Sequence, residues 1–174
     1  MESWRKEIIL EEIMIKYGSE LVGLAFHYVK EKEAAKDVVQ EVFIKCYENL
    51  GAFRYESSIK TWLYRITINK SKDYLRSWNY KKVYIKDYLG SSIKSLLPSP
   101  EEKVLNQEKQ EAIKKIIFSL PTKYREVIYL YYYQSLTINE ISELTENNIN
   151  TIKTRLVRAK TRLKIRMEEE NQIE

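Results

Sequence analysis

The sequence predicts an all-α protein of two small helical domains joined by a flexible linker. Three observations predict this class. Of the 174 residues, 44% are hydrophobic, which suffices for a packed core and is too many for a disordered chain. Only 4 Gly and 3 Pro occur, too few for the turns of a β-sandwich or for glycine-rich phosphate loops. Along most of the chain, apolar residues recur every three or four positions, as in amphipathic helices.

The first half of the chain is predicted to form four helices. Apolar spacing indicates helices over 5–16, from beyond Gly18 to Lys30, over 33–50 and over 59–80. Gly18 is expected to interrupt the first two, and Gly51 to end the third as a C-terminal cap. A polar loop over 52–58 precedes the fourth helix. We expect these helices to form one domain over 1–83.

The helical pattern fails over 84–103, where Pro98 and Pro100 disfavour helix, and we interpret this segment as the linker. The second domain is expected over 104–174. Its pattern predicts helices over about 101–118 and 121–134, a short helix from Thr137 and a last helix to about 168. Thr137 and Glu140 have the spacing of a capping box, and Asn148 is a candidate N-cap of the last helix.

The positive charge of the chain is concentrated in two segments. The net charge is +5, but seven basic residues and one acidic residue lie between 60 and 82, and seven basic residues with no acid lie between 149 and 167. These segments carry +6 and +7, so the remainder carries −8. Two separate basic surfaces favour two contacts with one polyanion, because clustered Lys and Arg displace counterions from phosphate. The alternative is that both are ordinary solvated helix faces.

The short helix, tight turn and basic last helix form a helix-turn-helix pattern. In this motif the second helix enters the major groove and its N-terminal part contacts base edges. Arg and Lys suit guanine, while Thr and Val suit a thymine methyl group. A helical hairpin without a DNA role is the alternative. The side chains that lie off the apolar stripe near the start of this helix are Asn150, Thr151, Lys153, Thr154, Val157 and Arg158.

Several classes of protein are disfavoured by composition. The single Cys46 cannot form an internal disulfide, and with the single His27 it cannot build a His/Cys zinc site without carboxylates, so we expect no metal and no cofactor. Cys46 lies on an apolar stripe and is expected in the core, the alternative being one half of a Cys–His nucleophile pair, which the residue counts allow. No signal peptide and no apolar run long enough to cross a membrane are visible, which predicts a cytoplasmic protein without membrane insertion.

Sequence blocks across nearly the whole chain resemble one family. Residues 37–43 read Asp-Val-Val-Gln-Glu-Val-Phe, and residues 61–66 read Thr-Trp-Leu-Tyr-Arg-Ile. Beyond the linker come Ser-Leu-Pro at 119–121, Tyr-Arg-Glu-Val at 124–127 and Thr-Ile-Lys-Thr-Arg-Leu-Val-Arg-Ala-Lys at 151–160. In this order and spacing, the blocks are similar to those of the extracytoplasmic-function (ECF) sigma factors of bacterial RNA polymerase.

The resemblance implies a transcription initiation factor with no active site, in which a sigma2-type domain binds the polymerase clamp and the minus-ten element. A sigma4-type domain would bind the minus-thirty-five element and the polymerase flap. Partners would be core RNA polymerase, promoter DNA and an anti-sigma factor, with no small-molecule substrate. The residues matching the family's contact positions are Asp37, Gln40 and Glu41 for the clamp; Phe53, Tyr55, Lys60, Trp62, Arg65, Asn69, Lys72 and Arg76 for the minus-ten element; and Asn150, Thr151, Lys153, Thr154, Val157 and Arg158 for the minus-thirty-five element.

The chain departs from the family at the turn of the helix-turn-helix. Glu146 and Asn147 stand where Gly and an apolar residue are common, and Ser142 stands where Ala is common. Because Asn tolerates left-handed backbone geometry, we expect the turn to survive with somewhat lower stability. Core residue and base-stacking platform are alternative roles for Trp62.

Three rival functions remain. A response-regulator output protein shares such a helix-turn-helix, but residues 1–80 show no alternation of strands and helices and no acidic receiver pocket. An enzyme would need a carboxylate cleft, metal set or phosphate loop, and none is discernible. An interaction protein whose basic helices bind acidic partners would differ by lacking steeply salt-dependent DNA binding.

Overall fold

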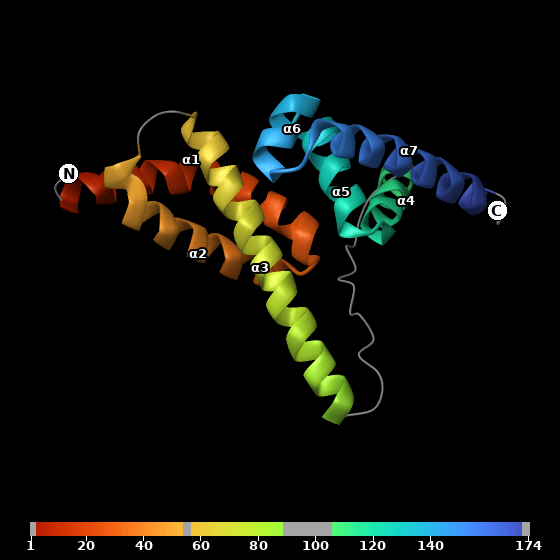
Figure 1. The fold of residues 1–174 in the computed structure, drawn as a ribbon, viewed down its shortest axis with the longest axis horizontal. Coiled ribbons are helices and arrows are strands. Elements are labelled where there is room, and N and C mark those ends of the chain that lie inside the picture. Colours follow the sequence, from red (N-terminus) through yellow and green to blue (C-terminus); the bar gives the residue numbers. More distant parts are fainter. Residues whose placement is uncertain (1–2, 54–56, 89–105, 172–174) are drawn as a thin grey trace.

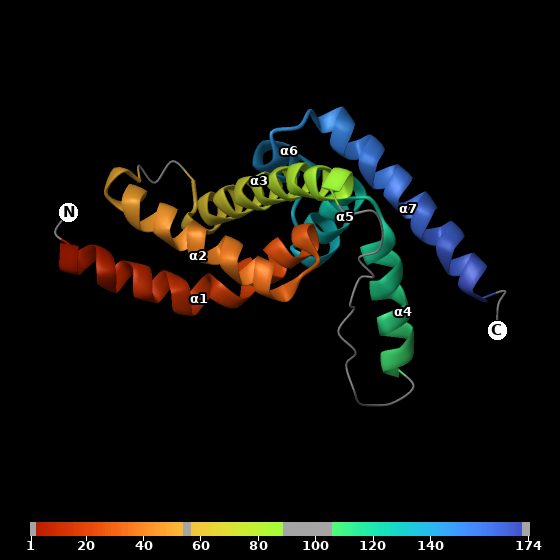
Figure 2. The same ribbon diagram turned by 90° about the horizontal axis from the view of Figure 1, so that it is seen from below.

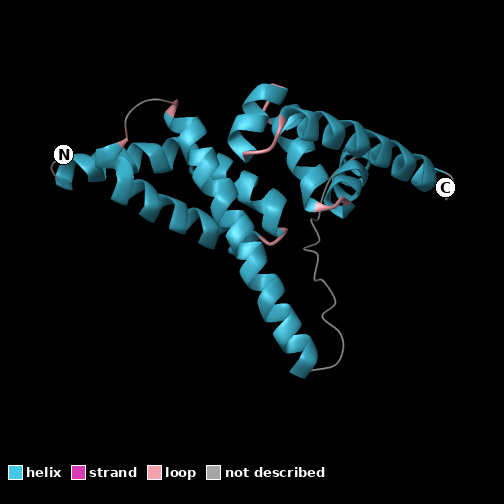
Figure 3. Cartoon of the chain, in the orientation of Figure 1, coloured by secondary structure: helices cyan, strands magenta, loops and turns pink. Residues whose placement is uncertain are grey.

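The computed structural model describes residues 3–53, 57–88 and 106–171, and all regular structure within these ranges is helical (Figure 3). The all-α prediction is therefore confirmed. Three helices come from the first half of the chain and the remainder from the second half, so the elements fall into two groups along the sequence (Figure 1).

The N-terminal domain consists of α1 (Ser3–Val29), α2 (Lys32–Asn49), a 3₁₀ turn η1 (Leu50–Ala52) and α3 (Ile59–Tyr88). Helix α2 lies along α1, and α3 crosses both (Figures 1 and 2). The buried faces interlock in a core to which each helix contributes fully buried side chains. They include Leu21 and Leu24 of α1, Val42 and Cys46 of α2, and Leu63 and Ile68 of α3.

The predicted break at Gly18 is wrong, because α1 continues through this residue. An interior glycine costs a helix only about 1 kcal/mol relative to alanine. The packing of α1 on α2 and α3 outweighs that cost. Beyond Val29 the chain turns at Lys30, whose φ of 63° is left-handed and whose amide donates to the Phe26 carbonyl (2.9 Å).

The C-terminal domain consists of α4 (Asn106–Ser119), α5 (Thr122–Ile128), a π-helical turn η2 (Tyr129–Tyr133), α6 (Ile138–Thr145) and α7 (Ile149–Asn171). The helix predicted over 121–134 is present, but its last turn widens to π geometry. Helix α3 extends to Tyr88, beyond the predicted end at residue 80 and into the segment expected to be the linker. The remainder of that segment, 89–103, lies outside the described residues.

The helix-turn-helix prediction is confirmed in detail at both helix starts. Thr137 and Glu140 form the capping box, with the Glu140 amide donating to Thr137 Oγ1 (3.2 Å) and the Thr137 amide donating to Glu140 Oε2 (2.7 Å). The Asn150 amide donates to Asn148 Oδ1 (2.8 Å), so Asn148 caps α7. The left-handed residue of the turn is Glu146 (φ 57°), whereas the prediction placed that geometry at Asn147.

The apolar stripe of α7 is shorter than predicted. Ile152, Leu156 and Ala159 are buried as expected. The two ends of the stripe, Ile149 and Met167, are each 40% exposed. Burial of the helix is therefore confined to its middle turns, and most of its surface faces outward.

The two domains pack directly against each other. Helix α1 contacts α5, and α3 contacts α6, so segments almost 100 residues apart lie side by side (Figures 1 and 2). The hydrophobic core is continuous from Leu24 of α1 to Leu130 of η2. The polar contacts at this boundary involve two charged residues of α5, Arg125 and Glu126, both at most 4% exposed.

Candidate nucleic-acid and polymerase interfaces

The predicted clamp-contact residues share one exposed face of α2. Asp37, Gln40 and Glu41 are all exposed, while the alternating positions Val38 and Val42 are buried against α1 and α3. Glu41 accepts a charge-assisted hydrogen bond from Lys70 of α3 (2.9 Å). This ion pair therefore links the acidic face of α2 to α3.

Sequence analysis missed one neighbour on this face. Ile44 follows Gln40 and Glu41 at helical spacing, and it is 60% exposed although it is a large apolar residue. Ile44 therefore adds exposed apolar area to the acidic face of α2. The signal available in the sequence was that Ile44 lies one turn after Gln40 and off the buried stripe.

A cavity of about 640 Å³ lies beside the start of α3. Its aromatic wall consists of Phe53 and Trp62, whose ring centroids are 4.8 Å apart. Trp62 also packs against the hydrophobic core, so it combines both of the roles considered from sequence. Arg65 supplies positive charge one turn along α3. The other lining residues are Lys45, Asn49, Ala52, Ser57, Thr61, Ile66 and Glu143.

Three of the eight predicted minus-ten residues meet at this cavity, namely Phe53, Trp62 and Arg65. Asn69 is exposed on α3, one turn beyond Arg65. Tyr55 lies outside the described residues. Sequence analysis missed Lys45 and Asn49 of α2, because their approach to the cavity depends on how α2 packs against α3.

The remaining basic residues predicted for the minus-ten element are paired with acids of the chain. Lys60 lies 2.5 Å from Glu20 of α1, and Arg76 lies 3.0 Å from Asp73 within α3. Lys72 lies 2.9 Å from the buried carboxylate of Glu126, which belongs to the C-terminal domain. Among the basic residues of α3 whose side chains the structure describes, Lys60, Lys70, Lys72 and Arg76 are thus paired with acids of the chain.

The predicted minus-thirty-five residues share the outward face of α7. Asn150, Lys153, Thr154, Val157 and Arg158 are exposed, and Val157 is 64% exposed although it is apolar. Thr151 is half-buried at the start of the helix. This combination of cations, hydroxyls and a methyl-bearing side chain is suited to the major groove.

A basic recess of about 330 Å³ lies at the start of α7. It is walled by Lys123 and Tyr124 of α5 and by Arg155 and Arg158 of α7, together with Asn150, Thr151 and Thr154. The Arg162 guanidinium lies 5.1 Å from the centre of the Tyr124 ring. Sequence analysis missed Lys123 and Tyr124. They follow Pro121 at the start of α5, and only the packing of α5 on α7 brings them to this recess.

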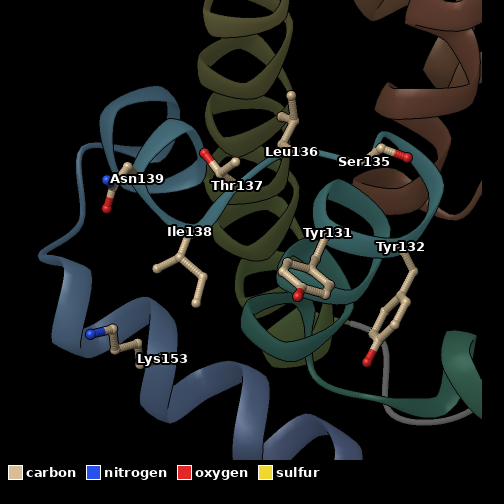
Figure 4. Close-up of a pocket in the computed structure, with 8 residues that line it drawn as sticks. All are labelled: Tyr131, Tyr132, Ser135, Leu136, Thr137, Ile138, Asn139 and Lys153. Carbon is tan, nitrogen blue, oxygen red and sulfur yellow. The ribbon is translucent and has the colours of Figure 1, made fainter.

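A groove of about 720 Å³ separates η2 and α6 from α7. Figure 4 shows Tyr131 and Tyr132 coming from η2, Ile138 from α6 and Lys153 from α7. Tyr132 is 52% exposed, and the Lys160 ammonium lies 5.5 Å from its ring centre. This arrangement combines an aromatic floor with a basic edge.

Neither a metal centre nor a membrane span is found in the described ranges. There, no group of three or more His, Cys, Asp or Glu residues is placed to hold a metal ion. No helix within the same ranges combines the length and the apolar composition needed to cross a bilayer.

These features define a helical transcription factor that pairs a cavity-bearing basic domain with a helix-turn-helix domain. The chain matches the family models of Sigma-70 region 2 over residues 13–79 and of Sigma-70, region 4 over residues 110–163. The chain belongs to the sigma-70 family, and within it to the ECF RNA polymerase sigma factors, which are transcription initiation factors.

Curated relatives align over nearly the full chain. The chain is 34% identical to RNA polymerase sigma factor SigV of Bacillus subtilis over 163 residues, covering 94% of this chain and 93% of the relative. It is 30% identical to the ECF RNA polymerase sigma-E factor of Escherichia coli K12 over 155 residues, covering 85% and 81%.

Solved structures share the fold. The sigma factor RpoE from Bartonella quintana, in complex with the anti-sigma factor NepR, superposes with a TM-score of 0.69 at 22% identity, covering 91% of this chain and 96% of that one. CnrH, in complex with the cytosolic domain of CnrY, gives a TM-score of 0.65 at 18% identity, covering 94% and 90%.

Proposed function

We propose that the chain directs core RNA polymerase to promoters through three separate faces. The acidic face of α2 binds the polymerase clamp, the cavity beside α3 takes an unstacked minus-ten base, and the outward face of α7 reads the minus-thirty-five duplex. The observation that carries this proposal is the pairing of an aromatic-walled, cationic cavity in one domain with an exposed recognition helix in the other.

The minus-ten step uses the cavity walled by Phe53 and Trp62. An extruded base gains stacking on aromatic rings, worth about 1–3 kcal/mol per base. Arg65 and Lys45 offer positive charge to the flanking phosphates, and Asn49 and Thr61 offer polar groups to the base edge. Holding one base outside the duplex nucleates melting. Tyr55, Lys60, Asn69, Lys72 and Arg76 are assigned to the strand on either side of that base.

The minus-thirty-five step uses the face of α7. Lys153 and Arg158 suit guanine, and Thr154 and Val157 suit thymine methyl groups. Asn150 and Thr151 at the helix start, with Lys123 from α5, suit backbone phosphates, which accept hydrogen bonds and charge at helix N-termini. Arg155 and Tyr124 complete the basic recess around such a phosphate.

Two protein partners follow from the remaining surfaces. The aromatic groove between η2, α6 and α7 is assigned to the polymerase flap. An anti-sigma factor is assigned as a regulator, because both RpoE of Bartonella quintana and CnrH form complexes of that kind. The chain itself performs no catalysis and acts in the cytoplasm, where the polymerase supplies the chemistry.

Promoter-dependent run-off transcription with purified core polymerase and a genomic promoter library tests the proposal. The double variant Asp37→Arg with Glu41→Arg should abolish core binding, because it reverses the charge of the clamp face, and should leave minus-thirty-five duplex binding within about twofold. The double variant Glu11→Arg with Glu12→Arg, which reverses two exposed acids of α1, is the matched control. The clamp assignment is overturned if both double variants bind core polymerase like the unaltered chain.

A further inference from the structure

We propose that Tyr124 of α5 is a positioning residue for minus-thirty-five recognition, whose hydroxyl holds the Arg158 guanidinium at the edge of the outward face of α7, where it reads one base pair. This inference rests on the proposed function, because it uses the assignment of that face to the minus-thirty-five duplex. It deepens the assignment by naming a residue of a second helix on which the sequence preference depends.

Tyr124 faces α7, whereas the next two residues of α5 face the N-terminal domain. Arg125 donates to the Tyr28 carbonyl (3.2 Å), and Glu126 accepts from the Tyr28 hydroxyl (2.8 Å). Tyr124 is 5% exposed, and it lines the basic recess at the start of α7 together with Arg158. Because α5 packs on both α1 and α7, its residues divide between these two contacts.

Three cations surround the Tyr124 side chain. The Arg162 guanidinium lies 5.1 Å from the ring centre and the Lys123 ammonium lies 5.2 Å from it, within the range of cation–π attraction. The third cation, Arg158, makes a side-chain hydrogen bond with the hydroxyl. Because a guanidinium carries only donors, the hydroxyl oxygen of Tyr124 accepts this bond.

These cations also act on the ionisation of the hydroxyl. Burial raises the pKa of Tyr124, but the hydrogen bond from Arg158 and the positive charges of Lys123 and Arg162 lower it by more, so the net shift is downward. Surroundings that favour the ionised form also favour partial negative charge on the hydroxyl oxygen. The bond from Arg158 is therefore charge-assisted and stronger than a bond between two neutral groups.

Arg158 lies at the boundary between two sides of α7. Arg155 and Arg162 lie about one turn before and one turn after it, on the side that faces α5. Thr154 and Val157 are exposed on the outward face. From this boundary a long arginine side chain reaches either the DNA backbone or the base edges, and these two contacts have different consequences for sequence preference.

The bond to Tyr124 favours the base edge. A guanidinium is planar and presents its donors in a fixed fork, so holding one N–H group fixes the plane and direction of the others. Guanine O6 and N7 accept two such N–H groups together, which requires that plane to match the base pair. An arginine that is already held also loses less conformational entropy when DNA binds.

The DNA backbone has other donors in the same recess. Lys123 of α5 is exposed there, and Asn150 and Thr151 lie at the start of α7, where backbone N–H groups and the helix dipole favour a phosphate. These groups suffice to hold the phosphate. Arg158 therefore remains available for a base.

The test removes the Tyr124 hydroxyl alone. Tyr124→Phe keeps the buried ring with its cation–π contacts and core packing, and it deletes the acceptor of Arg158. Tyr133→Phe is the matched control, because its ring stacks on Tyr129 of the same domain (centroids 5.7 Å apart) and belongs to none of the proposed interfaces. The free energy of unfolding, measured by urea denaturation, should be similar in the two variants.

DNA binding is measured with the full chain in complex with core polymerase. The probe is the duplex that this holoenzyme enriches from a library randomised over the minus-thirty-five element. The competitors are all single base-pair substitutions of that duplex. Competition at fixed salt gives the preference at each base pair for the unaltered chain, for Tyr124→Phe, for Arg158→Ala and for the double variant.

We expect the two single variants to lose preference at the same base pair. Arg158→Ala should reduce discrimination there about 5- to 150-fold, the range for one bidentate base contact. Tyr124→Phe should reduce it about three- to tenfold, as for the loss of one hydrogen bond, and should change other positions less than twofold. The double variant should discriminate no less than Arg158→Ala alone. The salt slope of Tyr124→Phe should equal that of the unaltered chain, because no charge is removed.

Three results would overturn the inference: an unchanged preference in Tyr124→Phe, equal weakening of all duplexes by it, or additive losses in the double variant. Equal weakening would give Tyr124 a structural role only. Failure of the proposed function looks different, because the holoenzyme would then enrich no sequence from the library and Arg158→Ala would change binding at no base pair.

Discussion

The two surfaces assigned to promoter DNA are built in different ways. The minus-thirty-five face belongs to one helix, α7, and is exposed along its length. The minus-ten cavity draws its lining from η1, α2, α3 and α6, so it exists only when four separate segments are packed. The comparison teaches that the geometry of a surface on one helix depends on that helix alone. The geometry of a surface assembled from several elements depends on how all of them pack.

The basic residues of the two surfaces also differ in whether acids of the chain pair with them. On α3, Lys60, Lys70 and Lys72 each pair with an acid of another helix. On α7, Lys153 and Arg158 form no ion pair within the described residues. Although the two segments carry nearly equal formal charge, the positive charge of α7 is the more available to DNA.

We expect the largest effect when two exposed basic residues of α7 are removed. Lys153→Ala with Arg158→Ala should weaken minus-thirty-five duplex binding about 100-fold or more, because each base contact is worth about 1–3 kcal/mol. The matched change on α3, Lys60→Ala with Lys70→Ala, should cost less than tenfold for a single-stranded probe. Fluorescence anisotropy over a salt series measures both. Equal losses, or equal changes in salt slope, would show that internal pairing does not determine availability.

We expect an intermediate effect from a change in the turn that precedes α7, which leaves the minus-ten cavity unaltered. Glu146 holds a left-handed conformation that a side chain disfavours by about 1 kcal/mol. Glu146→Gly should therefore raise the free energy of unfolding by about that amount, as measured by urea denaturation. Glu143→Gly is the control, since it lies inside α6 and should lose stability. A loss of stability in Glu146→Gly would contradict the expected strain.

The smallest expected effect is a pH dependence of stability at the boundary between α1 and η2. His27 stacks on Tyr129 (centroids 3.7 Å apart), and its Nδ1 lies 2.8 Å from the Gly23 carbonyl. Burial and the nearby Arg125 charge lower the pKa of His27, while the hydrogen bond to Gly23 opposes that shift. The folded chain thus binds a proton less readily than the unfolded chain, so stability should fall as pH drops below about 6.5.

Urea denaturation between pH 7.5 and pH 5.5 measures this slope. His27→Gln should be less stable than the unaltered chain at pH 7.5 and should have a flatter slope. Parallel slopes for the two proteins would assign the pH dependence to other groups.

The features that could be predicted from sequence are those set by local spacing. The α2 face of Asp37 and Glu41 and the α7 face of Lys153 and Arg158 follow from helical period, since the same pattern that buries one side exposes the other. The capping box at Thr137 follows for the same reason, because its bonds span three residues.

The features that could not be predicted depend on distant packing. The continuation of α1 through Gly18 is set by contacts with α2 and α3. The partners of Arg125 and Glu126 lie almost 100 residues earlier in the chain, and a single sequence gives no such pairing. The one available signal was the occurrence of two adjacent charges just before an apolar run, since charges at such positions need partners.

The position of Arg125 also sets an order of events during synthesis. Its acceptors at His27 and Tyr28 leave the ribosome about 97 residues before it does, an interval of about 5–20 s at usual bacterial rates. Throughout that interval the nascent N-terminal domain has no C-terminal domain to cover it. In each new molecule the His27 and Tyr28 carbonyls at the end of α1 therefore lack their Arg125 donor until most of the chain has been translated.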